Sequence, residues 1–152
     1  MRASARLSVR PISRAEAQIY QMVLPQESLL LNCLKVIDWQ AFKAKLMAYY
    51  SDSGEGQPEY PPEILLKLEF LGHLYCASRS ALVERATYDL HWKYFLGLPI
   101  DAILPDHSTL SRFRGRLGPE GFQEIFREYP FLDDWKIHSI QRQELLLASL
   151  LK

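Results

Sequence analysis

The side chains best suited to chemistry lie between Pro105 and Gly118, in the run PDHSTLSRFRGRLG. This run contains three arginines and no acidic residue after its second position. Guanidinium groups bind phosphate oxygens through charge-assisted hydrogen bonds that are often bidentate, so phosphate binding is the chemistry expected here. A solvated helix face is the alternative, because basic clusters alone are weak motifs. The candidate residues in the run are Ser108, Thr109, Ser111, Arg112, Arg114 and Arg116.

Catalytic and metal-binding patterns are not supported by the sequence. Asp106, His107 and Ser108 are the residue types of a hydrolytic triad, but adjacent residues point in different directions and a triad must converge in space. The histidines offer at most an isolated partner at helical spacing, such as Glu69 for His73, and such a pair is too weak to indicate zinc or di-iron. There is no phosphate loop and no GxGxxG sequence. We therefore predict no catalytic residue, no metal site and no cofactor.

A short two-faced helix is expected to present the arginines. Pro105, Asp106 and the hydroxyl residues after them are a helix-start signal, because their oxygens can accept the amide hydrogens that a first turn leaves unpaired. Gly118 is expected to end the helix. At about 100° per residue, the apolar residues fall on one stripe opposite Arg112 and Arg116. The stripe consists of Leu110, Phe113 and Leu117.

The composition predicts one domain with a real core. The chain has 152 residues, of which 48% are apolar, and a domain of this size buries roughly 68–70% of its unfolded surface. Lys plus Arg and Asp plus Glu are equal at 18 each, so no global field indicates a polyanionic partner. Any signal for such a partner must be local.

The two cysteines and the hydropathy pattern predict a cytoplasmic protein without a membrane segment. Cys33 and Cys76 lie outside any CxxC arrangement and are expected to be reduced and buried. No apolar run approaches the roughly 20 residues that cross a bilayer, and the N-terminus lacks a signal-peptide pattern.

The remaining elements are expected to be helical, giving an all-α, small multi-helix bundle. Residues 1–23 are the exception, because they are rich in arginine with Glu16 as the single acid, and we expect a flexible basic arm. Helices are expected over residues 26–37 and, after a cap at Asp38, over residues 39–49. Residues 51–60 are rich in turn formers and predict a loop. The next predicted helices follow Pro61, Ser78 and Pro119, and the first of these is expected to be the centre of the core, with Glu63 and Lys67 paired on its exposed side.

A helix-turn-helix-like unit is predicted where the helix after Pro61 meets the helix after Ser78. Helix, short turn and helix is the shape of that motif. Arg79 and Arg85 fall on the polar side of the second helix and are added to the candidate DNA-binding residues.

Several landmarks in this order resemble a known family. They are VIDW at residues 36–39, YPPEILLK at 60–67, SRSALVE at 78–84, YFLGL at 94–98 and PDHSTLSRFR at 105–114. Over residues 24–128 the chain resembles the N-terminal helical domain of InsH-type insertion-sequence transposases. The resemblance implies a module that engages the ends of the element, followed by a separate ribonuclease-H-like domain whose three acids bind divalent metal. The likeness ends near Tyr129, so no catalytic acid is carried over, and residues 129–152 are expected to be a divergent tail.

The function expected from this resemblance is that of a truncated transposase fragment that binds double-stranded DNA at terminal inverted repeats and is not an enzyme. The alternative is a helical association module, pairing with a second copy or an intact transposase, or a relic without a role. The near-zero net charge and an apolar run at residues 145–151 favour the alternative.

Overall fold

The described part of the protein, residues 9–51, 60–75 and 77–125 of a computed structural model, contains seven α-helices and no strand. The all-α prediction is confirmed. The helices are α1 (Arg14–Val23), α2 (Leu29–Val36), α3 (Trp39–Ser51), α4 (Pro62–Leu74), α5 (Arg79–Tyr88), α6 (Leu90–Leu96) and α7 (His107–Ile125). None of these helices is long and apolar enough to cross a membrane.

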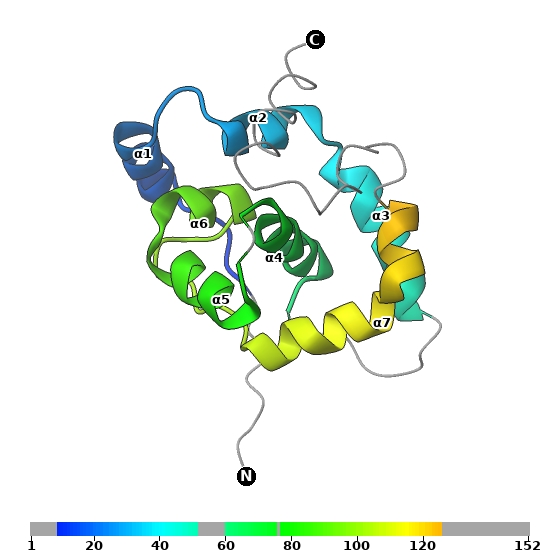
Figure 1. The fold of residues 1–152 in the computed structure, drawn as a ribbon. Coiled ribbons are helices and arrows are strands. Elements are labelled where there is room, and N and C mark those ends of the chain that lie inside the picture. Colours follow the sequence, from blue (N-terminus) through cyan, green and yellow to red (C-terminus); the bar gives the residue numbers. More distant parts are fainter. Residues whose placement is uncertain (1–8, 52–59, 76, 126–152) are drawn as a thin grey trace.

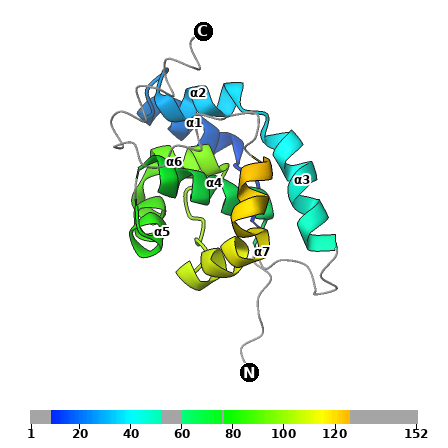
Figure 2. The same ribbon diagram turned by 45° about the vertical axis from the view of Figure 1, so that its right-hand side comes forward.

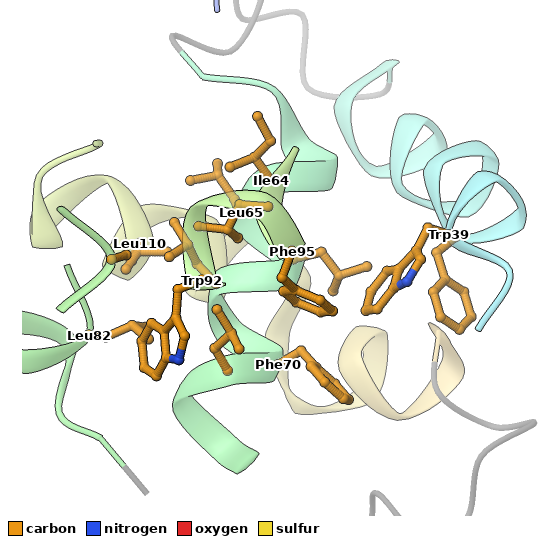
Figure 3. Packing of buried hydrophobic residues seen from close by; sticks show 14 of the residues in the cluster. Trp39, Ile64, Leu65, Phe70, Leu82, Trp92, Phe95 and Leu110 are labelled. Atoms are coloured by element: carbon orange, nitrogen blue, oxygen red, sulfur yellow. The ribbon is translucent and has the colours of Figure 1, made fainter. Parts of the chain in front are cut away.

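Helix α4 is the centre of the core, as predicted. It begins at Pro62, where a missing amide hydrogen is tolerated because the first turn has no acceptor for it. Every residue from Ile64 to Leu71 is buried, and Figure 1 shows α4 surrounded by the other helices. Leu82 of α5, Trp92 of α6 and Leu110 of α7 meet beside it (Figure 3).

Aromatic rings join α3 and α6 to α4. The Trp39 ring meets the rings of Phe70 and Phe95 edge to face, each at a centroid distance of 5.6 Å, and all three side chains are buried. Edge-to-face contacts add to the free energy of burial because the positive edge of one ring meets the negative face of another. Figure 3 shows these three rings turned toward one another.

The predicted pairing of Glu63 with Lys67 is confirmed, but its predicted place on an exposed side of the helix is wrong. Lys67 is 7% exposed, and its Nζ lies 4.0 Å from Glu63. The ammonium donates a hydrogen bond to the Phe95 carbonyl oxygen at 3.2 Å and lies over the Trp39 ring at 5.3 Å. Because α4 is covered on nearly all sides, even its long cationic side chain ends among aromatic rings.

The prediction of a flexible arm over residues 1–23 is wrong for its helical part. Residues 14–23 form α1, which begins with a capping box between Ser13 and Glu16. Arg10 contributes to the same corner, because its guanidinium pairs with Glu16 at 2.6 Å and with Asp101 at 2.6 Å. The Tyr20 hydroxyl then donates to the Leu98 carbonyl oxygen at 2.9 Å and holds α1 on the bundle. Residues 1–8 lie outside the described part.

The predicted helix starts at Asp38 and Ser78 are confirmed. The Asp38 carboxylate accepts the Ala41 amide at 3.1 Å, and the Ser78 hydroxyl accepts the Ala81 amide at 3.3 Å. Cys33 is buried with a free thiol, and burial raises its pKa to about 12. Cys76, most of the predicted loop at 51–60 and the tail at 129–152 lie outside the described residues.

Candidate nucleic-acid interface

The helix that carries the arginines is positioned by its apolar stripe. The Asp106 carboxylate accepts the Ser108 amide hydrogen at 3.3 Å, which caps the first turn of α7. Leu110, Phe113 and Leu117 are 0%, 2% and 5% exposed, as the periodicity predicted. Gly118, with φ 65° and ψ 172°, then breaks the helical path, and Pro119 begins the second half of α7. Figures 1 and 2 place the first half of α7 at the end of the molecule away from α1 and α2, while its second half turns up along α3.

The side of α7 opposite the stripe carries Arg112 and Arg116. Arg112 is exposed, and Arg116 is partly exposed one turn later. The Arg112 guanidinium donates to the Thr109 hydroxyl at 3.4 Å, and the Ser111 hydroxyl donates to the His107 carbonyl oxygen at 3.2 Å. Both contacts join a polar side chain to a residue of the preceding turn.

Arg114 leaves this side and turns toward α4. Its side chain is 48% exposed, and its Nε lies 3.9 Å from an oxygen of Glu69, which is 5% exposed. Arg79, the first residue of α5, has a buried Nε with no hydrogen-bond partner among the described residues. The positive charges of both arginines oppose the rise in the pKa of Glu69 that burial causes.

Arg85 has a different environment from the other candidates. Its guanidinium pairs with Asp89 at 3.2 Å and lies over the rings of Tyr75 and Trp92 at 5.0 Å and 4.3 Å. A cation held on two aromatic faces supports the packing of α5 on α6. The structure therefore gives Arg85 an internal contact at the junction of these two helices.

The contribution of Glu69 was missed by sequence reasoning. In the sequence it appears only as a weak partner of His73, whose Nε2 lies 3.9 Å from the carboxylate. The sequence does offer one signal, a glutamate in the middle of an apolar helix. Acidic residues are almost never buried unless they are paired, so this position predicts a positively charged partner. Its partner Arg114 on α7 is distant in sequence and could not be inferred from spacing.

The helix-turn-helix-like unit stays a prediction. Helices α4 and α5 contact each other and are joined by residues 75–78, and both also contact α7. Within residues 9–51, 60–75 and 77–125, no group of three or more metal-ligating side chains occurs.

A cleft of about 480 Å³ lies between α1, α2 and α6, away from the arginines. Its lining includes Tyr20, Leu24, Leu31, Lys35 and Tyr94. No candidate DNA-binding residue lines this cleft, so it is separate from the candidate interface.

Comparison with known proteins places these residues in a family context. The sequence profile described as "Transposase domain (DUF772)" matches residues 18–116, a range that includes every candidate residue. A curated relative from Rhizobium meliloti, "Uncharacterized protein ORF8 in nfe locus", is 29% identical over an alignment of 105 residues, and the match covers 64% of this chain and 47% of the relative. The chain thus spans about half the length of the relative it matches. No solved structure matches the chain significantly.

Proposed function

We propose that the chain binds double-stranded DNA through the arginine-bearing side of α7. The chain belongs to the transposase domain family DUF772. Transposases act on DNA. In this proposal the chain binds the ends of the element. Strand cleavage belongs to a separate domain, as the resemblance to InsH-type transposases implies. The observation that carries the proposal is the outward placement of Arg112 and Arg116 opposite a buried stripe.

The geometry suits phosphate contact for a physical reason. The stripe of Leu110, Phe113 and Leu117 fixes the rotation of α7 about its own axis, because turning the helix would expose three buried side chains. Side chains one turn apart on a fixed helix can meet neighbouring phosphates of one DNA strand. Phosphate contacts position a protein on DNA but carry no sequence information. This surface therefore supports binding to double-stranded DNA in general and does not identify a target sequence.

Fluorescence anisotropy on the full chain tests the proposal. The probe is a labelled duplex of a terminal inverted repeat from an insertion sequence of this family, with a scrambled duplex of equal length as the control. If three to five arginines meet phosphates, the logarithm of affinity should fall with the logarithm of salt at a slope of about −0.9 per contact. Absence of binding to either duplex at low salt would contradict the proposal.

A second candidate function is association with a second copy of this chain, and one surface favours it. Ile19, Met22 and Val23 share one side of α1 and are 42%, 84% and 56% exposed. Apolar side chains that gather on a surface can mark contact sites, and a two-fold dimer brings the same surface of both copies together. Sedimentation velocity over a range of concentrations tests this, because a strict monomer excludes it.

A further inference from the structure

Glu69 is a carboxylate inside the core helix. It is 5% exposed, and its chain neighbours Leu68 and Phe70 are 0% and 1% exposed. Its Oε1 is buried and has no hydrogen-bond partner among the described residues. A buried carboxylate is unfavourable unless nearby positive charges and hydrogen bonds compensate for lost water. The positively charged residues near Glu69 therefore show which other helices it interacts with.

The compensating cations come from three helices. His73 of α4 and Arg114 of α7 approach the same Glu69 oxygen, each at 3.9 Å, and His73 contributes charge only when protonated. Arg79 at the start of α5 acts on the carboxylate electrostatically, and its own Nε is buried without a hydrogen-bond partner in the described part. Burial raises the pKa of Glu69, and the positive charges of Arg114 and Arg79 oppose that rise.

We infer that Glu69 is a positioning residue for DNA binding, which holds Arg114 of α7 beside α4. This inference rests on the proposed function and adds a residue that does not itself meet DNA. Arginine side chains lose considerable rotamer freedom when they are ordered. A carboxylate that orders them in the unbound protein reduces the entropy lost on contact with phosphate. The half-exposed Arg114 can keep its Nε toward Glu69 while its terminal nitrogens face solvent.

The test compares Glu69→Gln with the unaltered chain in the anisotropy assay at pH 8. Glutamine keeps the size of the side chain and removes the charge, so we expect affinity to fall about tenfold while helical circular dichroism is unchanged. The matched control is Glu63→Gln, which removes an acid near Lys67 on the same helix and should leave affinity unchanged. Equal or tighter binding by Glu69→Gln would overturn the inference.

A double-mutant cycle separates positioning from a general structural role. If Glu69 acts through Arg114, then Glu69→Gln should have much less effect on affinity in an Arg114→Gln background. The same loss in both backgrounds would show that Glu69 only supports the fold and would overturn the inference.

A measurement without DNA separates the pairing of Glu69 with Arg114 from the proposed DNA-binding function. The pKa of Glu69, followed by carbon NMR of its carboxyl group, should rise in Arg114→Gln because a compensating charge is removed. An unchanged pKa would overturn the pairing whether or not the chain binds DNA, and this readout also serves if Glu69→Gln fails to fold. Failure of the unaltered chain to bind DNA, with the pKa rise present, would instead overturn the DNA-binding function and, with it, the positioning role.

Discussion

The guanidinium carbon of Arg85 lies 4.3 Å from the centroid of the Trp92 ring. The same group pairs with Asp89, whose carboxylate also caps α6 by accepting the His91 and Trp92 amides. One arginine side chain thus links the end of α5 to the start of α6, which makes Arg85 a packing residue in the unbound protein.

Replacement of Arg85 by alanine is therefore expected to act on stability. Loss of the ring contacts and the ion pair should lower the free energy of unfolding by about 1–2 kcal/mol, measured by urea denaturation. The matched control is Glu84→Ala on the same helix, an exposed site where a change within about 0.5 kcal/mol is expected. Unaltered stability together with a shallower salt slope for DNA binding would instead place Arg85 at the DNA interface.

Joint replacement of Arg112 and Arg116 by alanine is expected to weaken DNA binding without loss of helical circular dichroism. If each arginine contacts one phosphate, the salt slope should become shallower by about 0.9 per arginine. The control is Arg14→Ala with Lys35→Ala, which removes two exposed cations from α1 and α2, the helices that lie away from the first half of α7 in Figures 1 and 2. An equal loss of affinity in both double variants would show a non-specific charge effect.

The helix pattern could be predicted from the sequence where local rules decide. The stripe of Leu110, Phe113 and Leu117 follows from periodicity alone, and the caps at Asp38 and Ser78 follow from residue type. These predictions hold because each depends on residues within a few positions of one another.

Long-range contacts account for the predictions that failed. Arginine-rich residues 1–23 predicted a flexible arm, but Arg10 pairs with Asp101, which is 91 positions away. Lys67 was expected at the surface because charged residues are normally exposed, whereas the fold brings the Phe95 carbonyl and two rings to its ammonium group. Spacing in the sequence predicts neither the contact of Arg10 with Asp101 nor that of Lys67 with Phe95.

Glu16 is expected to make stability depend on acid pH. The Arg10 guanidinium lowers the pKa of Glu16 well below its ordinary value of 4.5, and the Ser13 amide contributes further. A carboxylate with a lowered folded-state pKa stabilises the fold above pH 4.5, and this contribution is lost as the pH falls toward the folded-state pKa. Glu16→Gln should therefore lower the thermal unfolding midpoint at pH 7, and the difference from the unaltered chain should narrow as the pH is lowered to 3. A difference that stays constant over this range would contradict the linkage.

Replacement of Gly118 by alanine is expected to destabilise the kink in α7. Its backbone, at φ 65° and ψ 172°, lies in a region essentially restricted to glycine, so alanine should cost about 1–3 kcal/mol of unfolding free energy. A Cβ at this position meets nothing within 4 Å, so the cost comes from the backbone and not from crowding.

Gly115→Ala is the matched control for the kink. Gly115 also has open space around a Cβ but no positive φ, so alanine should raise stability by up to about 1 kcal/mol. The kink matters because it directs the second half of α7 onto α3, where the Glu124 carboxylate accepts the Tyr49 hydroxyl at 2.6 Å. Urea denaturation of both variants measures the two effects. Similar stabilities for Gly118→Ala and Gly115→Ala would mean that α7 does not need this backbone conformation to reach α3.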